Sequence, residues 1–204
     1  MRGQSAMETT TIIFWLVVLA LVIYVISIYN RLVTLKNRYA NAFAQIEVHL
    51  KRRYDLIPNL VETARAYMAH ERETLEAVTL ARNDAEAALR AVGAGEVGAS
   101  ELTRLAGAEN ALQGALGKLN VTMEAYPEIK ANENMQQLSE ELTTTENRVA
   151  FARQGFNDAV MAYNSYRQSF PPVVFASTFG HPADAQLLEF DDSVQIQAAP
   201  RVSF

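Results

Sequence analysis

One short stretch of the chain, KRRYDLIPNLVETARAYMAHE at positions 51–71, carries most of the side chains that could do chemistry. Its His70-Glu71 pair resembles half of a zinc-protease motif, in which two histidines four residues apart share one helix face with a glutamate between them. The second histidine would stand at position 74, but that residue is Thr74. The sequence therefore predicts no metal site in this stretch.

The three basic residues that open the stretch, Lys51, Arg52 and Arg53, allow two interpretations. They could bind anionic lipid or a partner protein. They could instead form a solvated helix face, on which Arg52 and Asp55 make an ordinary ion pair worth about 0.3 kcal/mol. The solvated face is the preferred interpretation. The carboxylates over 140–158 are likewise expected on the solvent-exposed side of their helix.

The composition of the 204-residue chain excludes several kinds of site. It contains no cysteine, which excludes disulfides, thiol nucleophiles and cysteine-based metal sites. Its formal net charge of −5 argues against a general nucleic-acid-binding protein. The glycine-rich GAGEVG at 93–98 lacks the lysine and the preceding strand of a phosphate-binding loop. We therefore expect no catalytic residue, no cofactor and no enzymatic activity.

The elements that must position these side chains begin with a long apolar segment. No residue from Thr9 to Asn30 is charged, and IIFWLVVLALVIYVISIY at 12–29 is almost wholly apolar. Eighteen helical residues span roughly 27 Å, close to the hydrocarbon thickness of a bilayer. A cleaved secretory signal is the alternative, but this run is longer than a typical signal core and no small-residue cleavage motif follows it. We therefore predict a single membrane-spanning helix. Its anchoring residues are Ile12, Trp15, Leu19, Tyr24, Ile28 and Tyr29.

Basic residues flank this segment unequally. Arg31, Lys36 and Arg38 follow it closely, whereas only Arg2 and the terminal amine precede it. Because the cytoplasmic flanks of membrane helices are richer in lysine and arginine, we expect a short external N-terminus and a cytoplasmic body.

After the anchor, the chain is predicted to be helical for most of its length. From Ile28 to Met68 apolar side chains recur at gaps of three or four residues, the spacing of one helix face. Pro58 disturbs this helix because it has no N–H to donate to the carbonyl of Tyr54. Either the helix kinks there and continues, or Asp55 caps a new helix. The unbroken apolar pattern favours the first.

The same spacing predicts two further helices, one over 75–89 and one from Ser100, its predicted cap, to about Ala125. A glycine-rich linker separates them. Within the second of these helices, Gly107 and Gly114 each cost about 1 kcal/mol relative to alanine. They indicate either a loose helix or the close approach of a neighbouring helix, for which small side chains leave room.

The last predicted helix has the most regular pattern. Its apolar positions alternate gaps of three and four residues from Met135 to Phe170, with Thr145 as the polar exception. A period of 3.5 residues indicates left-handed, coiled-coil-like packing against another helix.

The segments together predict an all-α fold: a short N-terminus and transmembrane helix over 1–30, an antiparallel bundle of about four helices over 31–170, and an extended proline-rich tail over 171–204. Since alternating helices in even number bring the last one back toward the bilayer, VVFASTF at 173–179 should emerge at membrane level. We expect this apolar strip to pack on the membrane-proximal stem or to bridge to a neighbouring subunit. The candidate residues for contact with lipid or a partner are Arg31, Lys36, Arg38, Arg52, Arg53, Phe175 and Phe179.

The chain resembles the LemA family of bacterial membrane-anchored proteins over roughly residues 24–180. The resemblance is carried by YNRLVTLKNRYANAFAQIEVHLKRRYDLIPNLVETARAYMAHE, by AYPEIKANENMQQLSEELTTTENRVAFARQGFNDAVMAYNSYRQSFP and by the FASTFG that follows. Phe43 stands where the family usually has tryptophan. The resemblance implies an N-terminal anchor and an antiparallel helical bundle, and it supplies no catalytic residue. A relative takes part in magnetosome formation, which suggests a role in membrane organisation.

These observations lead to a functional hypothesis. We expect a single-pass, self-associating scaffold or interaction protein of the bacterial inner membrane, whose partners are the lipid bilayer, further copies of the chain and in some cases another membrane protein, but not nucleic acid. The alternative is an accessory subunit that regulates a membrane enzyme or protease.

Overall fold

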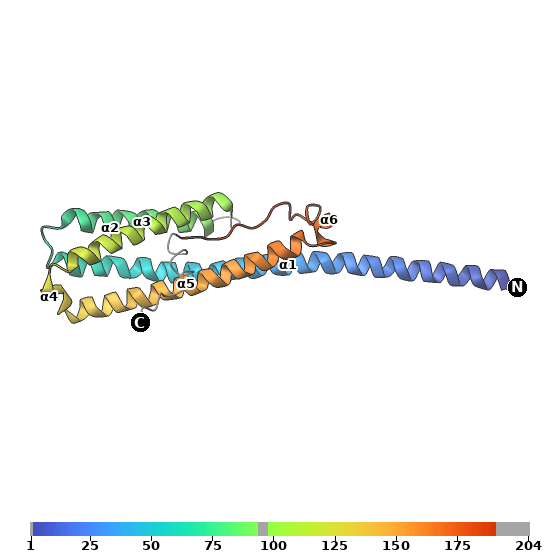
Figure 1. The fold of residues 1–204 in the computed structure, drawn as a ribbon, viewed down its shortest axis with the longest axis horizontal. Helices are drawn as coiled ribbons and strands as arrows, with labels where there is room; N and C mark the ends of the chain where they lie inside the picture. The colour runs from blue at the N-terminus through green and yellow to red at the C-terminus, as the bar shows by residue number, and fades with distance from the viewer. Residues whose placement is uncertain (1, 94–97, 191–204) are drawn as a thin grey trace, which may run out of the picture.

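The computed structural model describes residues 2–93 and 98–190, with side chains from Thr10 onward. The described residues form helices and no strand, which confirms the predicted all-α fold (Figure 1). The helices are α1 (Arg2–Arg65), α2 (Arg72–Gly93), α3 (Ala99–Met123), α4 (Pro127–Lys130), α5 (Glu133–Gln168) and α6 (Pro172–Ala176).

Helix α1 runs without a break through Pro58, so the continuation of the helix past this proline is confirmed and a new helix capped by Asp55 is not formed. The kink at Pro58 stays a prediction. The lost hydrogen bond at the Tyr54 carbonyl is replaced from outside the helix. The Arg82 Nε of α2 donates to this carbonyl at 3.1 Å. A helix tolerates an internal proline when a neighbouring group satisfies the freed carbonyl, which explains the continuity of α1.

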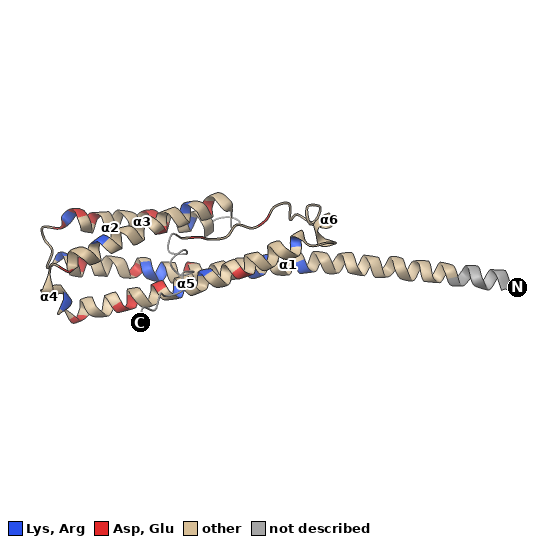
Figure 2. Ribbon diagram, in the orientation of Figure 1, with Lys and Arg blue, Asp and Glu red and all other residues tan. Residues whose placement is uncertain are grey.

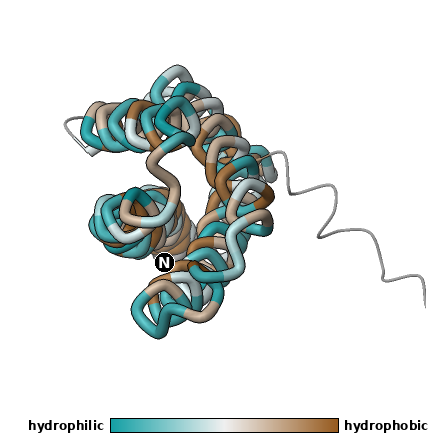
Figure 3. Tube along the Cα trace, turned by 90° about the vertical axis from the view of Figure 1, so that its left-hand side faces the viewer, coloured by the Kyte–Doolittle hydropathy of each residue, from teal (hydrophilic) through white to brown (hydrophobic). Residues whose placement is uncertain are grey.

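The long helices alternate in direction, as predicted. We call the apolar N-terminal part of α1, up to Asn30, the stem. From the stem the chain runs along the rest of α1 and returns along α2. It then runs out again along α3, turns through α4 and comes back along α5 (Figure 1). Helix α5 packs along α1, and α3 packs along α2, which in turn contacts α1. Viewed down the bundle axis, the helices lie side by side with many hydrophilic positions on the outside (Figure 3).

The core follows the predicted apolar pattern of α5. Positions seven residues apart along this helix are all buried: Met135, Leu142, Val149, Phe156 and Tyr163. Seven-residue spacing keeps these side chains on one face of the helix, which here lies against α1. The Phe156 ring is fully buried and meets the rings of Tyr39 and Phe43 edge-on at centroid distances of 6.4 and 5.7 Å.

Two details of α3 differ from the predictions. Cβ atoms built at Gly107 and Gly114 meet nothing within 4 Å among the described residues, so the close-approach explanation of these glycines is wrong. The helix begins at Ala99 after Gly98, and the Ser100 hydroxyl donates to the Glu101 carboxylate at 2.7 Å instead of capping the helix. Ser100 is the second residue of the helix, so its hydroxyl lies inside the first turn and not at the N-cap position, which Gly98 occupies.

The described part of the predicted tail is packed against the body. After α6 the backbone forms no regular helix or strand. The side chains of Asn157 and Asn164 of α5 form hydrogen bonds to it. Asn157 accepts from the Leu188 N–H at 2.9 Å and donates to its carbonyl at 3.1 Å, and Asn164 bonds both backbone groups of Ala185 in the same way. Each side-chain amide therefore satisfies both backbone groups of one residue, as a neighbouring β-strand would. These bonds hold the segment against α5, with the Leu188 side chain in the core. Residues 191–204 of the predicted tail lie outside the described residues.

Candidate functional site

The described side chains of the stem are mostly apolar, and most of them are not covered by the rest of the protein. Its helix is long and apolar enough to cross a membrane, and nearly all of its apolar part is uncovered by the rest of the protein. Figure 2 shows no charged residue along the described part of the stem before the blue residue at its base. The side chains of Ile12, Trp15, Leu19 and Tyr24 are at least half exposed, as a lipid-facing anchor requires.

Ile28 was predicted both as an anchoring residue and as the first residue of the apolar face that continues to Met68, and the structure places it on that packed face. It is buried, in a small cluster with Leu32 and Leu35 of α1, Tyr163 of α5 and Ala176 of α6. The reason is that α5 returns beside the base of the stem and α6 folds over it. The structure thus confirms that the last helix ends near the stem.

Helix α6 and the turn after it also contact the stem directly. The rings of Tyr29 and Phe179 meet edge-on with centroids 5.4 Å apart, and Phe179 in turn stacks on Phe175 at 5.9 Å. The expected packing of the 173–179 strip on the stem is therefore confirmed. A contact of Phe175 or Phe179 with a partner or with lipid stays a prediction.

The basic residues predicted to meet lipid or a partner occupy different environments. Arg31 and Arg38 are exposed near the base of the stem, and Lys36 is half-buried there. Their contact with lipid stays a prediction. Arg52 is exposed and donates to Glu141 of α5 at 3.0 Å, so the predicted pair between Arg52 and Asp55 is replaced by a bond between helices.

Arg53 was expected on a solvated face, and this prediction is wrong. Its side chain is only 6% exposed, its Nη1 donates to Glu109 of α3 at 2.9 Å, and its Nη2 donates to Glu146 of α5 at 2.9 Å. The Tyr54 hydroxyl donates to the second carboxylate oxygen of Glu109. Arg53 follows Leu50 by three residues and precedes Ile57 by four, which places it on the buried face of α1. A buried polar cluster thus joins α1, α3 and α5.

The protonation of this cluster is shifted by its burial. Loss of solvent, the largest influence, raises the pKa of Glu109 above the ordinary value of 4.5, and the adjacent Arg53 guanidinium opposes the rise. Burial also raises the pKa of Tyr54, which stays protonated and keeps its hydrogen bond to Glu109. The charged groups of the cluster bond to one another, and Arg53 Nε is its one buried polar atom without a hydrogen-bond partner in the described residues. These bonds join three helices, which favours a role in fixing their positions.

This shift predicts a pH dependence of stability. A carboxyl whose pKa is higher in the folded chain contributes stability that is fully present below its unfolded pKa and is lost as pH rises through its folded pKa. Relative to Glu109→Gln, the free energy of unfolding of the wild-type chain should therefore decline as pH is raised above 4.5. Urea titrations of the full chain in detergent across this range measure the difference. A difference that changes in favour of the wild type with rising pH would contradict the assignment.

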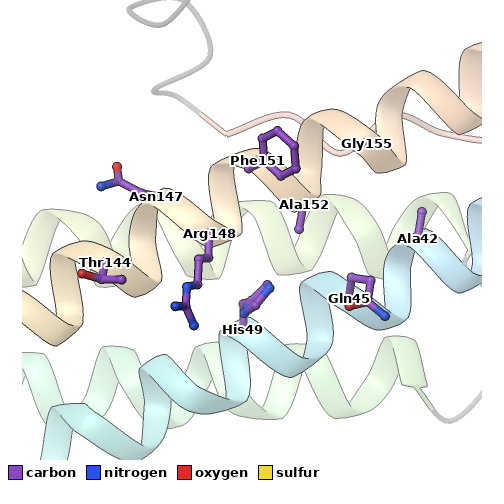
Figure 4. Close-up of a pocket in the computed structure, with 9 residues that line it drawn as sticks. All are labelled: Ala42, Gln45, His49, Thr144, Asn147, Arg148, Phe151, Ala152 and Gly155. Carbon is purple, nitrogen blue, oxygen red and sulfur yellow. The ribbon is translucent and has the colours of Figure 1, made fainter.

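A groove of about 610 Å³ opens between α1 and α5 (Figure 4). Helices α2 and α3 lie behind it in this view, so the groove faces outward. Its lining is mostly apolar, with His49 and Arg148 extending into it from the two facing helices. Phe151, on the α5 wall, is 80% exposed. The groove is lined by Ala42, Gln45, His49, Thr144, Asn147, Arg148, Phe151, Ala152 and Gly155.

The groove is lined by side chains suited to non-covalent contacts. Its nine lining residues include one histidine and no carboxylate, so this histidine has no acidic partner within the lining. In the described residues, no group of three or more His, Asp or Glu side chains is placed to hold a metal ion. Near the predicted half-motif, Glu71 instead accepts a hydrogen bond from the Tyr126 hydroxyl at 3.2 Å.

The whole chain was compared with known protein families, and the match found covers most of the bundle described above. The LemA family model matches residues 42–204, which cover α5, the buried Arg53 cluster and the groove. The chain belongs to the LemA family. The resemblance of the sequence to this family is thereby confirmed. The family description adds no enzymatic activity.

This LemA family chain is also similar to two curated proteins, the magnetosome proteins MamQ 1 and MamQ 2 of Paramagnetospirillum magneticum (strain ATCC 700264 / AMB-1). Each is 25% identical over 179 residues, an alignment that covers 79% of this chain. The chain spans 65% of the length of these relatives. Family membership and this similarity fit a membrane-associated helical protein.

Four residues that shape these sites were not predicted from the sequence. Glu109 lies four residues after Leu105 and three before Leu112, so its spacing already marked it as buried. Asn157 and Asn164 each follow a buried aromatic residue of α5 by one position, and their seven-residue separation was a signal for a repeated contact. Phe151 is a large apolar residue on the solvent-exposed face of α5, which is typical of a binding surface.

Proposed function

We propose that the protein is a membrane-anchored helical scaffold or interaction protein, held in a bacterial inner membrane by one crossing of its stem, with its body on the cytoplasmic side and no catalytic activity of its own. Its partner in this proposal is a second copy of the same chain, bound at the α1–α5 groove. The observation that carries the proposal is the exposed Phe151 ring beside an apolar groove that the chain's own helices leave open.

The shape of the groove supports a second copy as its occupant. Ala42, Ala152 and Gly155 are small, and a Cβ built at Gly155 meets no described atom within 4 Å, so the groove has room for a large side chain. Phe151 is such a side chain and belongs to the same surface. A surface that carries both a projecting ring and a hollow is self-complementary, which is the requirement of a two-fold contact between identical chains.

Membrane anchoring makes this contact easier to form. Stems in one bilayer confine the bodies to a shallow layer with similar orientation, which raises their effective concentration. The positive flank Arg31 and Arg38 supports the cytoplasmic placement of the body.

The groove proposal predicts that Phe151→Ala weakens self-association by roughly 30-fold, since exposed aromatic anchors at the centre of an interface contribute about 2 kcal/mol or more. Sedimentation of the detergent-solubilised full chain over a range of concentrations measures this effect. Leu80→Ala is the matched control, because Leu80 is also exposed, at 64%, but lies on α2 outside the groove. The control should associate like the wild type.

Two outcomes would contradict this proposal. If Phe151→Ala associates as strongly as Leu80→Ala, the groove is not the contact between copies. If the wild-type chain stays monomeric at every concentration in detergent and in lipid nanodiscs, self-association is absent, and the accessory-subunit hypothesis becomes the better one.

A further inference from the structure

A second apolar surface lies at the end of the body nearest the stem. Phe170, Val173 and Val174, which we call the α6 tip, are 82%, 48% and 62% exposed. The opposite side of the same short segment is covered, since Pro172 and Ala176 are buried and Phe175 is half-buried. The segment therefore presents apolar side chains both toward the protein and away from it. Exposed apolar groups clustered in this way are unfavourable in water.

The α6 tip lies at a defined depth along the stem. A bilayer core of about 30 Å requires about 20 helical residues, and the uncharged part of the stem extends from Thr9 to Asn30. Ile28 and Tyr29 therefore fall in the last turn that the hydrocarbon core needs. Because Ile28 is buried in a cluster with Ala176 and Tyr29 meets Phe179, α6 must lie at the same depth as these residues.

The α6 tip is also held rigidly at this position. The Tyr163 hydroxyl and His181 Nδ1 share a hydrogen bond at 3.0 Å in a buried environment. Arg167 donates to the carbonyls of His181 and Pro182 and to the Asp184 carboxylate. These bonds fasten the residues after α6 to α5, and the chain itself joins the start of α6 to the end of α5. The tip is therefore tied to α5 on both sides and cannot easily turn its apolar side chains inward.

We propose that the α6 tip inserts into the interfacial region of the same bilayer that the stem crosses, beside the first positive charge after the stem, Arg31. The partner surface is lipid, and anionic headgroups would meet Arg31 at this level. The proposal rests on the membrane crossing in the proposed function. Its consequence is a second attachment point, which fixes the tilt of the body and the direction in which the α1–α5 groove faces along the membrane.

The absence of cysteine from the chain allows a direct test with single labels. Val174→Cys and Val121→Cys are each labelled with a polarity-sensitive nitrobenzoxadiazole probe in the full chain. The chain is then reconstituted into phosphatidylcholine–phosphatidylglycerol vesicles that contain a lipid spin-labelled high on the acyl chain. Val121 is the matched control, since it is also an exposed valine, at 69%, but lies near the far end of α3.

The expected result is a loss of about half or more of the emission at position 174 and little loss at position 121, because interfacial segments lie roughly 5 to 10 Å into the boundary region where this spin label resides. Emission from Trp15, the single tryptophan of the unlabelled chain, reports stem insertion in the same vesicles. Quenching of Trp15 without quenching at 174 would overturn the inference and leave the membrane anchor intact.

Two other outcomes are equally decisive. If neither Trp15 nor position 174 is quenched, the membrane crossing itself fails and the inference fails with it. If the probe at 174 is shielded from the lipid quencher until the protein is diluted with more lipid, a second copy covers the tip and the lipid assignment is overturned.

Discussion

Replacing Arg53 with methionine should lower the free energy of unfolding by roughly 3 to 5 kcal/mol at neutral pH. The substitution keeps much of the length of the side chain and removes its charge. Glu109 is 1% exposed and would then lose the cation that compensates its carboxylate in the interior. Removing one partner of a buried ion pair costs more than the pair itself contributes, because the remaining charge cannot regain its solvent.

The matched control is the neighbouring Arg52→Met. Arg52 also pairs with a glutamate of α5, but both side chains are substantially exposed, so this change should cost about 1 kcal/mol or less. Urea titration of the full chain in detergent, followed by circular dichroism, measures both variants. Adding Glu109→Gln to Arg53→Met should recover part of the loss, and acid pH should do the same by protonating Glu109. Equal costs for Arg52→Met and Arg53→Met would show that the buried cluster is not a determinant of stability.

The sequence predicted the helices well because their main determinant is local. Gaps of three and four residues between apolar side chains bury one face of each helix, wherever its partner lies. The last helix, predicted over 135–170, runs from Glu133 to Gln168. The return of this helix to the stem followed from alternation alone, since short connections between helices force antiparallel neighbours.

The polar contacts of the interior could not be predicted in the same way. The apolar pattern gives no weight to charged residues, so Arg53 was assigned to solvent and Glu109 was passed over, although the spacing of both matched buried positions. Their pairing joins residues that are 56 positions apart, and only the packing of α3 near α1 brings them together. The path of the chain after α6 could not be predicted from the sequence for a related reason. It depends on Asn157 and Asn164 acting as substitutes for backbone partners, and no local propensity encodes this role.

Truncating Phe156 to alanine should cost roughly 3 to 5 kcal/mol of unfolding free energy, the usual range for a fully buried aromatic ring. The ring is 0% exposed and lies between Tyr39 and Phe43 of α1. Its loss would leave a cavity in the seam between α1 and α5. Because the same seam orders the base of the stem and the segment after α6, we also expect faster amide exchange in Ala185 and Leu188, whose N–H groups are held by α5.

The same helix offers a control for this truncation. Phe151 lies five residues earlier on α5 and is 80% exposed, so Phe151→Ala removes the same atoms while its cost should stay within about 0.5 kcal/mol. The two variants separate the two roles of α5. Phe156→Ala should destabilise the bundle, whereas Phe151→Ala should leave stability unchanged and weaken the contact between copies. If both variants unfold at the wild-type urea concentration, the α1–α5 seam is not the core of the bundle. If both are destabilised alike, the Phe151 side of α5 is covered in the folded chain, and the groove is not free to bind a partner.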